Sequence, residues 1–155
     1  MARTLELLPL GNLLLVRWRS GATRAAVHEI LRAIEAIRSA HGSAYYLALH
    51  GPELGLTDVD RDVAAADSAA LLIKCAEMHL VVERGGATSD LLRTSFRLLL
   101  LAARTGRIVT HAKALERADC VHIHASLGEA LSKLGTKITT PHEDVRVALR
   151  VNDML

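Results

Sequence analysis

Two short apolar runs near the start of the chain, residues 4–8 and 13–18, are separated by the sequence PLGN. Gly11 and Asn12 in this break tolerate the positive φ angles that a tight turn requires. The two runs are therefore predicted to form a β-hairpin.

The stretch that follows has the period of an amphipathic helix. Charged residues fall on the other sides of this helix, while apolar residues recur at spacings of three and four, at Val27, Ile30, Leu31, Ile34 and Ile37. Gly42, directly after His41, can adopt the left-handed conformation that ends a helix. We therefore predict a helix that ends at residues 41–42.

Two later runs, AYYLALH at 44–50 and HLVVE at 79–83, are short, continuous and apolar, which is typical of buried strands. Between them a helix is predicted over residues 58–76, because Thr57 and Asp60 have the spacing of a helix-start motif. Another helix is predicted to begin at Asp90. This third helix is apolar nearly all round.

The segment 107–118 is predicted to contain a strand followed by a short helix. In VHIH, at 121–124, apolar residues alternate with histidines, which is the period of a strand with two different faces. Ser126 is placed to cap a short helix that Gly135 ends. The order of elements is thus a hairpin followed by alternating helices and strands, which predicts an α/β fold with a small mixed sheet and packed helices.

The tail at residues 136–155 carries two conflicting signals. Thr140, Pro141 and Glu143 have the spacing of N-cap, N1 and N3 of a helix, but a strand-like alternation follows at Val145, Val147, Leu149 and Val151. We expect a capped helical turn that runs into a strand or an extended arm. Such an arm could dock on another subunit.

The composition limits the class of protein. A chain of 155 residues, half of them apolar, is sufficient for one domain with one core, which we place at residues 1–135. The net charge of +2 is spread along the chain, so we expect no nucleic-acid partner. The apolar runs are too short for a membrane span, and Cys75 and Cys120 have no disulfide or zinc-binding spacing. These features favour a cytoplasmic protein.

Two sequences, MHLVVERGG at 78–86 and VHIHASLGEALSKLG at 121–135, resemble the STAS family, the small regulatory domains of bacterial anti-sigma factor antagonists. The similarity covers residues 12–134. It implies a non-enzymatic domain that acts by protein–protein contact and is switched by phosphorylation of a serine after an aspartate. Ser68 follows Asp67 but lies inside the predicted second helix, while Thr57 occupies the equivalent place at the helix start. Both are phosphoacceptor candidates.

Two further sets of residues are candidates for ligand binding. His122 and His124 share one strand face, but no third metal ligand is recognisable, so we expect a polar face rather than a metal site. The turn at 85–89 precedes a helix, and its backbone N–H groups could hold an anion with the help of Arg93. A strand-to-helix turn requires glycine and a cap in any case, so a purely structural role is the alternative for Gly85, Gly86, Thr88 and Ser89.

The sequence contains no nucleophile motif such as GxSxG and no phosphate-binding GxGxxG, so no enzymatic activity and no cofactor are expected. The apolar third helix and the tail carry more apolar surface than one core absorbs, which favours a homodimer. The leading hypothesis is thus a STAS-like regulatory domain with an unidentified protein partner. The alternative is a small-ligand- or metal-binding domain that uses the His122/His124 face or the 85–89 turn.

Overall fold

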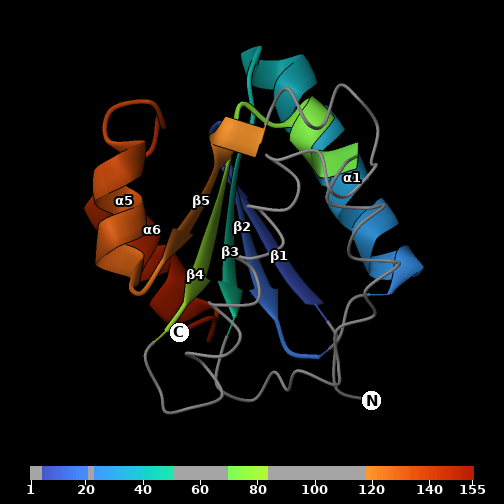
Figure 1. Cartoon of the computed structure of the whole chain (residues 1–155). Coiled ribbons are helices and arrows are strands. Elements are labelled where there is room, and N and C mark those ends of the chain that lie inside the picture. Colours follow the sequence, from blue (N-terminus) through green and yellow to red (C-terminus); the bar gives the residue numbers. More distant parts are fainter. Residues whose placement is uncertain (1–4, 21–22, 51–69, 84–117) are drawn as a thin grey trace.

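The computed structural model describes residues 5–20, 23–50, 70–83 and 118–155, and in these ranges the chain forms an α/β fold with helices on both faces of one sheet (Figure 1). The sheet has five strands in the order β1-β2-β3-β4-β5. Their bounds are Leu5–Leu10, Leu13–Trp18, Tyr45–His50, Glu77–Val82 and Val121–His124. β1 pairs antiparallel with β2, and each later strand is parallel to the strand before it. The predicted mixed sheet with an N-terminal hairpin is confirmed.

The hairpin turn is tied to a distant part of the chain. Gly11 has a φ of 56° at the first of the two turn positions, where a type II′ turn requires glycine. Asn12, the second turn residue, binds the loop near residue 138. Its side-chain Nδ2 donates to the Lys137 carbonyl oxygen at 2.9 Å, and its Oδ1 accepts from the Thr139 backbone N–H at 2.8 Å. The turn therefore positions the segment that connects the last two helices.

One face of the sheet packs against α1, Arg24–His41, which is the predicted first helix (Figure 1). The Thr23 hydroxyl caps its start by accepting from the Ala26 N–H, and Gly42, with a φ of 80°, ends it. Alternate residues of the strands contribute to this interior because successive side chains in a strand point to opposite faces. The main members are Leu14, Val16, Trp18, Tyr46, Ala48 and Met78 from the sheet and Val27, Ile30 and Ile34 from α1.

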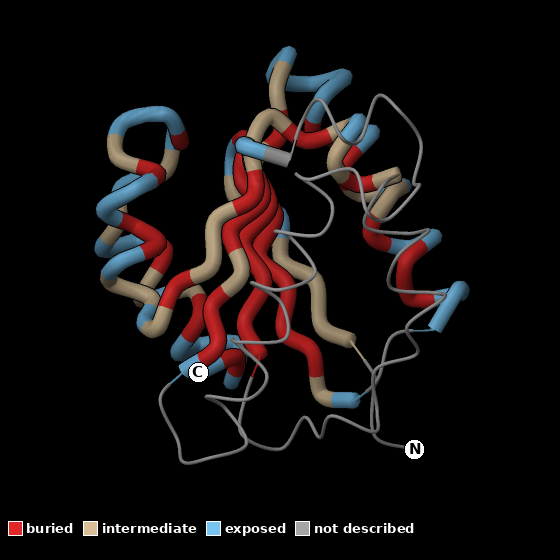
Figure 2. Tube along the Cα trace, in the orientation of Figure 1, coloured by how far each residue is buried: buried red, intermediate tan, exposed pale blue. Residues whose placement is uncertain are grey.

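The opposite face packs against α5, Leu127–Leu134, and α6, His142–Val151 (Figure 1). Ser126 caps α5 as predicted, by accepting from the Glu129 N–H, and Gly135 follows its last residue. The remaining alternate residues of the strands form this second interior, with Leu13, Leu15, Leu47, Leu49 and Val81 meeting Leu131, Leu134, Val145 and Leu149. Figure 2 shows that the middle of the sheet is buried between the two helix layers.

The expectation of a strand or extended arm in the tail is wrong. Residues 142–151 form one helix, α6, and Pro141 occupies its N-cap position without a side-chain cap. Val145 and Leu149 are four residues apart and lie on the buried side of this helix, where both are fully buried against the sheet of their own chain. The docking of the tail on another subunit stays a prediction. The inner side of α6 is buried in its own chain, so such docking would use the outer side of this helix.

Several predicted elements fall partly or wholly outside the described residues. The predicted helix at 58–76 is described only at its end, where residues 70–74 are helical as expected. The helix from Asp90 and the segment 107–117 lie outside. Within the described ranges, no helix is both long and apolar enough to cross a membrane.

Candidate functional site

The α5/α6 face of the sheet carries a cluster of polar side chains on its last two strands. Glu77 and His79 are alternate residues of β4, and His122 and His124 are alternate residues of β5, so all four point to the same face. The parallel register sets His79 directly beside His122. Four polar side chains thus lie together on the last two strands, beside the leucines that β2 and β3 contribute to the same face.

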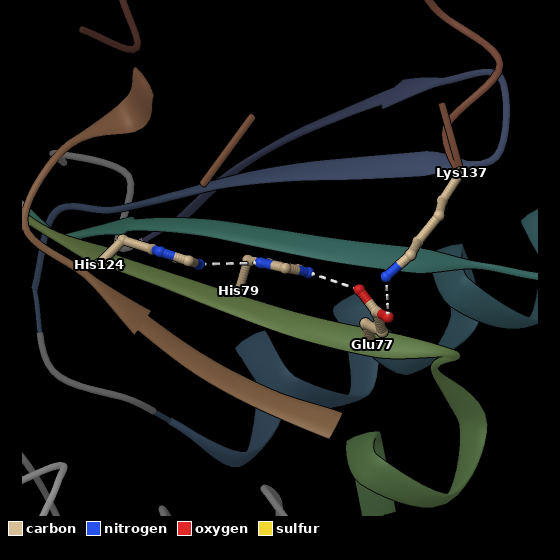
Figure 3. A network of polar contacts seen from close by, with 4 residues as sticks. All are labelled: Glu77, His79, His124 and Lys137. Carbon is tan, nitrogen blue, oxygen red and sulfur yellow. Dashed lines mark hydrogen bonds and ion pairs between the residues drawn. The ribbon is translucent and has the colours of Figure 1, made fainter. Parts of the chain in front are cut away.

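Three of these side chains form a hydrogen-bonded row with Lys137, from the loop after α5 (Figure 3). His124 Nε2 lies 2.9 Å from His79 Nδ1, and His79 Nε2 lies 3.0 Å from Glu77 Oε2. The other carboxylate oxygen, Glu77 Oε1, accepts from the Lys137 ammonium at 2.5 Å. The fully buried imidazole of His79 is therefore bonded through both of its ring nitrogens.

The row fixes the positions of the ring protons. A carboxylate only accepts, so His79 Nε2 must carry the hydrogen that is donated to Glu77. In the neutral ring, His79 Nδ1 then has a lone pair and accepts from His124 Nε2–H. His124 Nδ1 is left with its own lone pair. Glu77 thus orients His79, and His79 orients His124.

The electrostatics of the row keep its imidazoles neutral. Burial lowers the pKa of His79 to about 4, against the opposing effect of the Glu77 hydrogen bond. Burial, aided by the nearby His122, also lowers the pKa of His124. At Glu77 burial works to raise the pKa, but the hydrogen bonds from Lys137 and His79 outweigh it and hold the carboxyl pKa below its ordinary value. The hydrogen bond to Glu77 in turn raises the pKa of Lys137.

The three imidazoles are close enough to act together. The ring centroids of His79 and His122 are 4.9 Å apart, and those of His79 and His124 are 5.2 Å apart. One potential ligand atom from each of Glu77, His79 and His122 lies within 4.8 Å of the other two. Two imidazoles and a carboxylate are a common set of ligands for a transition metal. The cluster can therefore hold a metal ion or a polar ligand.

The structure places the two predicted histidines as expected, on the face opposite Val121 and Ile123, and adds a third that sequence reasoning did not connect with them. We expected no recognisable third ligand, yet His79 and Glu77 lie beside them on β4. A signal existed: Glu77 and His79 alternate on their strand in the same way that His122 and His124 do on theirs. Two apolar strands that each carry polar residues on one face were an indication of a shared site.

The other predicted site residues cannot be placed. Ser68 and Thr57, the phosphoacceptor candidates, lie outside the described residues. The same holds for the anion-binding candidates at Gly86, Thr88, Ser89 and Arg93, together with Gly85. Cys75 is buried among apolar side chains, and both cysteines are free thiols.

A second surface feature lies on the outer side of α6. Val147 and Val151 are 47% and 78% exposed, and Leu155, four residues further on, is 48% exposed. Side chains four residues apart share one side of a helix, so the two valines form an exposed apolar stripe. Charged residues flank the stripe, with Glu143 and Asp144 in the first turn of the helix and Arg150 in the last. 

Comparison with known proteins gives no family for the chain. No family model matches the sequence, and neither a curated protein nor a solved structure matches the chain.

Proposed function

We propose that the chain is a non-enzymatic regulatory domain of the STAS type, which acts by protein–protein contact and forms a homodimer through the outer side of α6. The antiparallel hairpin followed by parallel strands supports the STAS type. The observation that carries the proposed contact is the stripe of Val147 and Val151, since large aliphatic side chains on the outer side of a helix gain stability when a partner covers them.

The charges beside the stripe favour a second copy of this chain as the partner. In a two-fold homodimer, a residue that contacts a second residue of the partner is contacted by that second residue in return. We propose that the two α6 helices cross antiparallel, with Val147 at the two-fold axis. This arrangement places Asp144 of one copy level with Arg150 of the other, because both are three residues from Val147. The acidic first turn of each helix then lies against the basic last turn of its partner. Two symmetric ion pairs flank one apolar contact.

Sedimentation equilibrium at micromolar concentration tests this proposal. We expect the unmodified chain to be a dimer, and Val147→Asp to be a monomer because it sets two carboxylates in the apolar contact. Asp144→Arg and Arg150→Asp are each expected to weaken the dimer at least tenfold by bringing like charges together. The double variant Asp144→Arg/Arg150→Asp restores opposite charges and is expected to recover the dimer.

Glu29→Arg, an equally exposed charge reversal on α1, is the matched control and is expected to leave the dimer intact. A monomeric unmodified chain would overturn the proposal. A dimer that all the α6 variants leave unchanged would show that a different surface associates.

A further inference from the structure

We propose that Glu77, His79 and His122 bind one divalent transition-metal ion, such as Zn²⁺, between β4 and β5. The inference goes beyond the proposed protein contact and does not depend on it, because the cluster and the outer side of α6 are separate surfaces.

The spacing of the ligand atoms is close to that of a metal site. Three atoms that are all within 4.8 Å of one another leave room for a point within about 2.8 Å of each. Bonds from zinc to imidazole nitrogen or carboxylate oxygen are about 2.0–2.2 Å long. The ligands therefore need to move inward by less than about 1 Å. His122 and Glu77 are only partly buried, so side-chain rotation can supply this movement.

Each ligand on β4 already has an outer partner of the kind that metal ligands use. Metal-bound histidines usually donate from their second ring nitrogen to another acceptor, which fixes the orientation of the ring. If the metal takes His79 Nε2, the hydrogen moves to Nδ1 and is donated to His124 Nε2, 2.9 Å away. The hydrogen bond between the two histidines is kept and its direction is reversed.

Glu77 also has an outer partner that fixes its position. Lys137 binds Oε1, while Oε2 faces His79 at 3.0 Å and is the oxygen available to the metal. His124 and Lys137 are thus positioning residues, and Glu77, His79 and His122 are the ligands. With three protein ligands, a tetrahedral ion keeps one position for water or another ligand.

The cluster is also accessible. Glu77 has 18% of its side chain exposed and Lys137 44%, so an ion can reach the carboxylate from solvent. The site requires no rearrangement of the backbone.

Zn²⁺ binding to the untagged full chain tests the proposal. After treatment with a chelator and removal of the chelator, isothermal titration at about pH 7.5 is expected to show one Zn²⁺ per chain and a raised Tm. His122→Ala and Glu77→Gln are each expected to weaken binding roughly 100-fold, and His124→Ala roughly tenfold, which is the range for outer partners. Co²⁺ is expected to give a visible absorption band that His122→Ala loses.

Two control variants distinguish a specific Zn²⁺ site in the cluster from Zn²⁺ binding to exposed histidines elsewhere. His28→Ala and His41→Ala remove histidines from exposed positions on α1 and are expected to leave Zn²⁺ binding unchanged. Circular dichroism of each metal-free variant checks that it folds, and His122 is preferred over the fully buried His79 for this reason. Absence of Zn²⁺ binding, or equal binding by His122→Ala and the unmodified chain, would overturn the proposal. An equal loss in His124→Ala and His122→Ala would overturn the choice of ligands.

Discussion

The two faces of the sheet are covered in different ways. Within the described residues, the 18-residue helix α1 and the helical residues 70–74 pack on one face, and the strand residues beneath them are almost all apolar. The other face is covered by two shorter helices, and its interior divides into leucines on β2 and β3 and polar side chains on β4 and β5. His79, which is fully buried on this second face, has hydrogen bonds at both ring nitrogens, and an unpaired polar group there would be costly. Apolar packing stabilises the first face, whereas hydrogen bonds between polar side chains stabilise half of the second.

The largest expected effects test whether the two apolar interiors contribute equally to the free energy of unfolding. Ile34→Ala on α1 and Leu149→Ala on α6 each remove a fully buried side chain, so each is expected to lower the free energy of unfolding by about 2–5 kcal/mol. Urea unfolding at neutral pH measures both. A cost under about 1 kcal/mol for Leu149→Ala alone would contradict the packing of α6 on the sheet.

A pH series tests His50, a buried histidine of β3 on the α1 face. Burial, aided by the charge of Arg17, lowers the pKa of His50 to about 4, against about 6.5 in an unfolded chain. Protonation therefore favours the unfolded state, and the stability present above pH 6.5 is expected to fall as the pH drops towards 4. The loss from this residue is on the order of 3 kcal/mol.

Urea unfolding at intervals between pH 7 and pH 4 measures this dependence. His50→Gln does not titrate in this range, so its stability is expected to depend on pH less steeply, by up to about 1.4 kcal/mol per pH unit. Parallel pH curves for the variant and the unmodified chain would show that His50 is not held neutral.

The smallest expected effect concerns two glycines, Gly11 in the hairpin turn and Gly42 at the end of α1. A Cβ at Gly11 would lie 2.2 Å from the Thr139 hydroxyl, in addition to the strain of a φ of 56°, whereas a Cβ at Gly42 would meet nothing within 4 Å. Gly11→Ala is expected to cost about 1–3 kcal/mol and Gly42→Ala about 1 kcal/mol. Thermal unfolding of the two variants compares them. Equal costs would mean that Thr139 moves away without loss.

Local periodicity was sufficient to predict most of the described elements. The hairpin, α1 and the strands β3, β4 and β5 each carry a regular pattern of apolar residues and a capping or turn signal. The strand predicted in the tail is absent for a physical reason. Val145 and Leu149 form one pair at a spacing of four, and Val147 and Val151 form another on the opposite side of the same helix. Along the sequence the members of the two pairs alternate, so an apolar residue occurs at every second position, as it does in a half-buried strand.

The candidate site could be predicted only in part. His122 and His124 share a strand, so their common face follows from the period of two. His79 lies 43 positions earlier, and its place beside His122 depends on the register of two parallel strands, which nothing in either strand specifies. Lys137 reaches Glu77 only because Asn12 holds the loop to which Lys137 belongs. Contacts of this kind arise from the assembled sheet and not from local sequence.

The packing of α6 has a consequence for the synthesis of the protein. Leu13 and Leu47 precede Val145 and Leu149, which cover the same interior, by roughly a hundred residues or more. At about 5–20 residues per second, a ribosome needs roughly 5–20 s to add that length. During this time the nascent sheet exposes a row of leucines, so a chaperone that shields aliphatic surfaces would have a window in which to bind.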